Sequence, residues 1–178
     1  MFKKQEDISI NGSVSKNLII FSGPIRSGKS SRLYAFFKDW ENVAGILSLI
    51  IDDKKYLYSI RTKEKKLLEV INNESDNDVI TIGKYNFSKE VFAWGRKILS
   101  NDLKEKSGLI IIDEIGKLEL AGKGLAPTAF EIIKKSSAGS QKVMVVVRET
   151  LVKKFLEQIP QKNPRLNSSL LIRSNNFS

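Results

Sequence analysis

Cysteine and histidine are both absent from the 178-residue sequence. Their absence excludes disulfide bonds, thiolate and imidazole metal sites, and every catalytic dyad or triad that needs a cysteine nucleophile or a histidine base. Catalysis in this chain must therefore depend on carboxylates, hydroxyls, lysine, arginine and a bound metal ion. Glycine and proline are modest in number, and 41% of the residues are hydrophobic. This composition indicates a globular protein rather than a disordered one.

Long apolar runs are also missing. None approaches the roughly 18 residues of a membrane span, and residues 1–16 lack the apolar core of a signal peptide. We therefore expect a cytoplasmic protein with no membrane partner. The formal net charge of +10 suits anionic partners, including a nucleoside triphosphate or a nucleic acid. No run combines basic residues such as Lys54-Lys55 with regularly interleaved aromatic residues, so no motif indicates nucleic-acid binding, and we interpret the basic clusters as solvated surface. No feature indicates an oligomeric state.

A glycine-rich segment follows the apolar run Leu18–Phe21 and fits the pattern G-x-x-x-x-G-K-[ST] of phosphate-binding loops. Apolar residues at helical spacing come after it, so it has the strand-loop-helix context that the motif needs. Glycines allow the backbone to curl around phosphates, Lys29 supplies positive charge, and the Ser30 hydroxyl can bind Mg²⁺. The predicted nucleotide-binding residues are Gly23, Pro24, Ile25, Arg26, Ser27, Gly28, Lys29, Ser30 and Ser31. An accidental Gly-Lys-Ser turn is the alternative.

A second apolar run, Leu109–Ile112, ends in Asp113 and Glu114. Open α/β sheets bind ligands at the carboxyl ends of their strands, so Asp113 and Ser30 are the predicted Mg²⁺ ligands. Glu114 is the candidate catalytic residue that accepts a proton from the attacking water or holds that water in line with the γ-phosphate. The alternatives for Glu114 are a second acid near the metal and a plain surface charge.

Positive charge is needed where negative charge builds up on the transferring phosphate. Lys29 is one catalytic candidate. Arg148 is another, because it follows the apolar run Val143–Val147 and strand ends line the ligand crevice of such sheets. The weaker candidates are Arg26, Arg96 and Lys117.

The order of the apolar runs and helical patterns predicts one α/β domain over residues 1–178, with loose ends at 1–16 and 174–178. Residues 43–60 read as an antiparallel hairpin. The segment between the two motifs holds enough strands to place one between those that carry Lys29 and Asp113. Asp113–Gly116 also reads D-x-x-G, as in switch GTPases, but their guanine-reading N-K-x-D is missing. The missing guanine-reading motif and the strands between the two motifs together favour an ATPase-like sheet over that of a switch GTPase.

The sequence resembles the small P-loop family named after the human cancer-related nucleoside-triphosphatase. The likeness rests on GPIRSGKS at 23–30, IGKYNF at 82–87 and IIDEIGKLEL at 111–120, in matching order. The resemblance implies a three-layer α/β P-loop NTPase with a RecA-like, mostly parallel central sheet and an antiparallel hairpin extension. It also implies Mg²⁺-dependent hydrolysis of ATP, GTP and other nucleoside triphosphates to diphosphate and phosphate. The residues that it supports are Gly28, Lys29, Ser30, Asp113 and Glu114.

Three alternatives stay open at this stage. A nucleotide or small-molecule kinase would use the same phosphate site but would need an acceptor pocket. A nucleotide-dependent switch would hydrolyse slowly until a partner completes its site. A nucleic-acid-associated ATPase is compatible with the positive charge.

Overall fold

Seven strands of the chain form one sheet, in the order β4-β3-β2-β7-β8-β1-β9. The computed structural model describes residues 17–70, 78–137, 141–159 and 170–173. The strands are β1 (Leu18–Gly23), β2 (Val43–Ile51), β3 (Lys54–Ser59), β4 (Lys65–Leu67), β7 (Leu109–Ile115), β8 (Lys142–Arg148) and β9 (Leu170–Arg173). The strands from β2 to β9 in this order are parallel, whereas β3 and β4 add an antiparallel extension. A separate antiparallel pair comprises β5 (Val79–Ile82) and β6 (Tyr85–Ser88).

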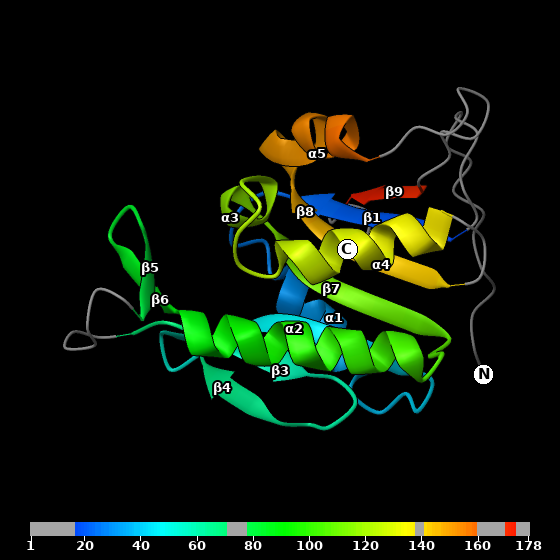
Figure 1. The fold of residues 1–178 in the computed structure, drawn as a ribbon, viewed down its shortest axis with the longest axis horizontal. Helices are drawn as coiled ribbons and strands as arrows, with labels where there is room; N and C mark the ends of the chain where they lie inside the picture. The colour runs from blue at the N-terminus through cyan, green and yellow to red at the C-terminus, as the bar shows by residue number, and fades with distance from the viewer. Residues whose placement is uncertain (1–16, 71–77, 138–140, 160–169, 174–178) are drawn as a thin grey trace.

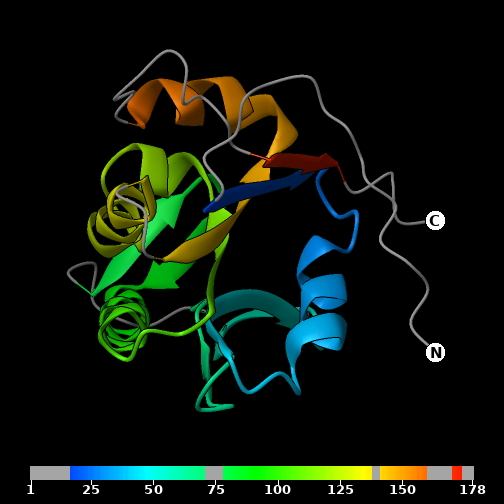
Figure 2. The same ribbon diagram turned by 90° about the vertical axis from the view of Figure 1, so that its right-hand side faces the viewer.

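Helices cover both faces of this sheet, so the fold has three layers (Figures 1 and 2). Helix α1 (Lys29–Phe37) lies on one face, and α2 (Lys89–Lys104) and α4 (Ala126–Ser137) lie side by side on the other. The remaining helical segments are α3 (Lys117–Leu120), η1 (Glu149–Leu151) and α5 (Val152–Gln158). No helix among the described residues is long and apolar enough to cross a membrane.

The central strands are apolar on both sides because each face has its own core. In β7, Ile110 and Ile112 pack with α2 and α4, whereas Ile111 packs with α1. All three isoleucines have 0% exposure. Strand β2 comes so close to β7 that a Cβ on Gly45, whose φ is 115°, would lie 2.0 Å from the carbonyl oxygen of Ile111. Only glycine fits this position without displacing backbone.

Several sequence predictions can be compared with these elements. The α/β P-loop fold is confirmed, and so is the hairpin over residues 43–60. A strand does separate β1 from β7, but the prediction of its source was wrong, because this strand is β8, which follows the acid pair in the chain. Strand β6 was not predicted, although Tyr85 and Phe87 alternate with polar residues there. The predicted loose ends, 1–16 and 174–178, lie outside the described residues.

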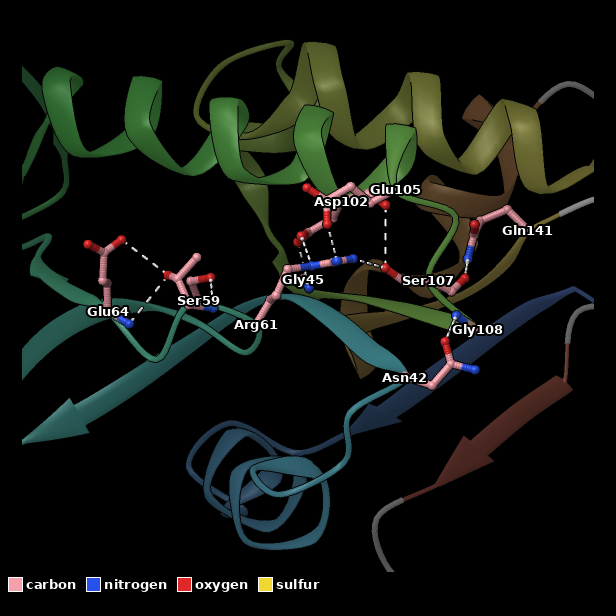
Figure 3. Close-up of polar contacts among 11 residues, drawn as sticks. Asn42, Gly45, Ser59, Arg61, Glu64, Asp102, Glu105, Ser107, Gly108 and Gln141 are labelled. Carbon is pink, nitrogen blue, oxygen red and sulfur yellow. Dashed lines mark hydrogen bonds and ion pairs between the residues drawn. The ribbon is translucent and has the colours of Figure 1, made fainter.

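A polar cluster joins the C-terminal part of α2 to the sheet (Figure 3). The buried Asp102 carboxylate accepts hydrogen bonds from the Gly45 backbone N–H and from Arg61 Nε, both at 2.9 Å. Arg61 also donates to Glu105 and to the Ser107 hydroxyl. Because Gly45 belongs to β2 and Arg61 follows β3, the cluster fixes α2 against both strands.

Candidate functional site

The glycine-rich loop, residues 23–30, joins the end of β1 to the start of α1. Gly28 has a φ of 75°, which allows the chain to turn directly into the helix. The Lys29 ammonium is drawn into this loop, where it donates hydrogen bonds to the carbonyl oxygens of Gly23 at 3.1 Å and Pro24 at 2.6 Å. Burial lowers the pKa of Lys29, while the charges of Glu114 and Asp113 act in the opposite direction. The negative charges of both acids therefore act on the Lys29 ammonium group.

Asp113 lies near the carboxyl end of β7 and is 1% exposed. Its Oδ2 accepts a hydrogen bond of 3.0 Å from the Ser48 backbone N–H in β2. Burial raises the pKa of Asp113 to about 6, although hydrogen bonds from the Ser30 side chain and the Ser48 backbone oppose this rise. Ser30 and Asp113, which sequence reasoning paired as metal ligands, therefore do lie together.

The second oxygen of Asp113 suits a metal ion. Oδ1 is buried and has no hydrogen-bond partner among the described residues. A buried carboxylate oxygen without a partner is costly, and a bound cation would satisfy it. The described residues contain no cluster of three or more metal-ligating side chains. A single carboxylate beside a hydroxyl agrees with Mg²⁺, which is commonly held by one or two carboxylates, substrate phosphates and water.

Glu114 projects from an irregular point in the sheet, because the register between β7 and β8 shifts between Asp113 and Ile115. Two cations hold its carboxylate. Arg148, at the end of β8, donates from Nε to Oε1 and from Nη2 to Oε2, the latter at 3.4 Å. Lys55 Nζ lies 3.7 Å from Oε2. Burial alone would raise the pKa of Glu114, but the Arg148 hydrogen bond and the charges of Lys55, Arg148 and Lys29 together lower it.

The structure thus brings Lys29, Ser30, Asp113, Glu114 and Arg148 to one edge of the sheet. Sequence reasoning did not select Lys55, because it grouped this residue with exposed basic clusters. The sequence pattern that could have distinguished Lys55 from exposed lysines is the period-two alternation of β3, in which Lys55 shares a face with the buried Leu57.

The other predicted cations have different surroundings. Arg96 donates to the carbonyl oxygen of Gly124 at 2.6 Å and so ties α2 to the segment before α4. Arg26 is exposed on the glycine-rich loop, where its φ is 59°. Lys117 is exposed at the start of α3, three residues after Glu114.

Comparison with known proteins bears directly on this arrangement. Residues 19–175 match the sequence model of a family described as NTPase. The chain belongs to this NTPase family. The match spans both the glycine-rich loop and the acid pair, so both parts of the site lie within the region that defines the family. No curated protein matches this NTPase in sequence.

A solved structure with a similar fold is that of THEP1 from the hyperthermophile Aquifex aeolicus. It superposes on the NTPase with a TM-score of 0.68 and covers 88% of each chain, at 21% sequence identity. At this identity the likeness establishes the three-layer fold, and the chemistry of the site has to be argued from this chain's own residues.

Proposed function

We propose that this NTPase hydrolyses nucleoside triphosphates to diphosphate and phosphate in a Mg²⁺-dependent reaction. The observation that carries the proposal is the position of Asp113 and Glu114 next to the lysine of a glycine-rich phosphate loop. Residues 23–31 would bind the phosphate chain through backbone N–H groups, with Lys29 exchanging its contacts to the loop carbonyls for contacts to phosphate oxygens.

Ser30 and Asp113 would hold the metal ion through the Ser30 hydroxyl and the unpartnered Oδ1 of Asp113. A metal ion held there would supply positive charge that neutralises part of the negative charge of the phosphate chain. The Ser48 backbone N–H keeps the other oxygen of Asp113 in place, so the carboxylate is already oriented before the ion arrives.

Glu114 would accept a hydrogen bond from the attacking water and hold that water in line with the γ-phosphorus. Its contacts with Arg148 and Lys55 support the role of orienting the water, because they fix the position of the carboxylate. Arg148 would contribute positive charge as the γ-phosphoryl group is transferred to water and the diphosphate leaves.

The proposal also covers the substrate range of the enzyme and its location in the cell. The string IIDEIGKLEL at 111–120 resembles that of the cancer-related nucleoside-triphosphatases. We therefore assign a broad substrate range, including ATP and GTP, and a cytoplasmic location.

The test is phosphate release from ATP, GTP, CTP and UTP with Mg²⁺. Replacing Glu114 by glutamine preserves its size but removes the negative charge that orients and activates water, so kcat should fall by about 10²–10⁴-fold. Triphosphate binding should persist in this variant. Glu157→Gln, which makes the same chemical change at an exposed position on α5, is the matched control and should retain full turnover. Equal turnover of Glu114→Gln and the unmodified protein would contradict the assignment of Glu114.

A further inference from the structure

A cavity of about 420 Å³ adjoins the acid pair. Ser48, Asp113, Glu114 and Arg148 line it, whereas no residue of the glycine-rich loop does. The charges of both acids nevertheless act on Lys29, and the Ser30 side chain hydrogen-bonds Asp113. The acid pair is therefore shared between the phosphate loop, with which it interacts, and this cavity, which we call the acceptor cavity. Its volume falls within the range of about 300–1,000 Å³ that is usual for small-molecule sites.

Part of the lining of the acceptor cavity is apolar. Leu57 of β3, Phe92 of α2 and Leu125 before α4 contribute to its lining and are almost fully buried. Strand β6 adds Tyr85 and Phe87, whose rings are stacked with an interplanar angle of 20°. The β5–β6 hairpin that carries them projects from the sheet beside the start of α2 (Figure 1). Such walls suit a planar ring, which gains both apolar burial and aromatic contact.

Four basic residues and the three acids Asp113, Glu114 and Glu119 border this apolar surface. Lys55, Lys84, Lys117 and Arg148 all line the cavity. Lys55 and Arg148 are paired with Glu114, but no described carboxylate lies within ion-pair distance of Lys84 or Lys117. Lys84 Nζ lies 5.3 Å from the centre of the Tyr85 ring, so a cation and an aromatic surface are presented together. The ligand that fits this lining carries a planar ring and a compact anionic group.

We propose that the acceptor cavity binds a nucleoside monophosphate and that its phosphate receives the γ-phosphoryl group in place of water. This inference rests on the proposed function, since the donor is the triphosphate bound at the glycine-rich loop. The base packs on the apolar and aromatic walls, and Lys84 and Lys117 bind the monophosphate. A sugar phosphate without an aromatic base leaves the apolar walls uncovered, and an uncharged nucleoside leaves the lysines unpaired.

The reaction balances without another reactant. An oxygen of the monophosphate forms a bond to the γ-phosphorus, and the bond between that phosphorus and the β,γ-bridging oxygen breaks. The products are two nucleoside diphosphates. The second pKa of a phosphate monoester is about 6, so the attacking oxygen is already deprotonated at pH 7 and no proton has to move.

The experiment uses the full chain with Mg²⁺ and γ-³²P-labelled ATP. AMP, GMP, CMP and UMP are supplied in turn, with ribose 5-phosphate as the probe without a base and adenosine as the probe without a phosphate. We expect labelled diphosphate from at least one monophosphate and from neither control probe. Hydrolysis of ATP alone is measured in parallel, so that loss of the proposed function is recognised separately. If ATP is hydrolysed but no labelled diphosphate forms, the acceptor role is wrong. The same conclusion holds if a monophosphate accelerates phosphate release without becoming labelled.

Three variants locate the binding site. Lys84→Ala and Lys117→Ala each remove a charged contact to the monophosphate, and each should raise its KM about tenfold. The exposed Lys97→Ala, on α2 and outside the cavity, should leave that KM unchanged. Calorimetric binding of the monophosphate should survive Lys29→Ala. If Lys29→Ala abolishes this binding while Lys84→Ala and Lys117→Ala preserve it, the monophosphate occupies the triphosphate loop and the inference is wrong. Urea unfolding of each variant verifies that it is folded.

Discussion

Replacing Asp102 by alanine removes the central acceptor of the cluster that joins α2 to the sheet. The Gly45 N–H lies inside β2 and would lose its buried acceptor, which costs about 1–3 kcal/mol. The Arg61 side chain is 34% exposed and keeps its bonds to Glu105 and Ser107. Losing its ion pair with Asp102 therefore costs only about 1 kcal/mol. Alanine returns about 0.5 kcal/mol through its better helix propensity. The free energy of unfolding should therefore fall by about 1.5–3.5 kcal/mol.

Urea unfolding measures this change as a shift of the midpoint at unchanged slope. Glu105→Ala is the internal control, because Glu105 contacts the same Arg61 but its side chain is 58% exposed, so the loss should stay below about 1 kcal/mol. The reasoning fails if Asp102→Ala destabilises the protein no more than Glu105→Ala does. That result would show that the buried Gly45 N–H finds another partner.

The same residue predicts a pH dependence. Burial raises the pKa of Asp102, although the Arg61 charge and the Gly45 N–H oppose the rise. A carboxyl group with a raised folded-state pKa binds its proton more tightly when folded, so stability is lost as pH rises through that pKa. The stability of the unmodified protein relative to Asp102→Asn should therefore be greatest below the unfolded pKa of about 4 and smaller at neutral pH. A difference that grows with pH would contradict this sign.

Three further predictions concern the site and the sheet. Arg148→Met should lower kcat for hydrolysis by roughly a thousandfold with little change in KM, and a loss below tenfold would argue against charge stabilisation by Arg148. Asp113→Asn should raise the Mg²⁺ concentration for half-maximal turnover by roughly tenfold or more, measured by titrating Mg²⁺ into EDTA-treated protein; an unchanged midpoint would remove Asp113 from the metal site. Gly45→Ala should cost roughly 3 kcal/mol or more in urea unfolding, because its Cβ meets backbone. Gly122→Ala, which shares the positive φ but has nothing within 4 Å, should cost only about 1–2 kcal/mol, and equal losses would show that the clash is relieved.

The sequence predicted those parts of the site that are encoded locally. The glycine-rich loop and the acid pair each follow a continuous apolar run, and such runs form buried strands whose ends carry the motif. The strand order could not be predicted in the same way, because parallel pairing joins segments that are distant in the chain. This is why the strand between β1 and β7 was attributed to the segment before Asp113, whereas β8 fills that place.

The partners of Glu114 illustrate the same limit. Arg148 was found because it stands at the end of an apolar run. Lys55 reaches Glu114 because the hairpin of β2 and β3 folds beside β7, and the local period-two pattern indicates only the face of β3 on which Lys55 lies, without indicating its partner. The acceptor cavity likewise draws its lining from elements spread between Ser48 and Arg148. Strand β6 could have been recognised from the alternation of Tyr85 and Phe87 after a two-residue Gly-Lys turn.

The position of β1 in the sheet has a consequence for the order in which the molecule can be assembled. Strand β1 comes first among the described strands, yet its neighbours β8 and β9 come last among them. Contacts between such distant segments form slowly, because a long loop must close before they are gained. During synthesis, β1 therefore remains an unpaired apolar segment until Lys142–Arg148 has left the ribosome. Nucleotide binding at the loop that follows β1 should accordingly be acquired late in folding, and a chain truncated before β8 should not acquire it.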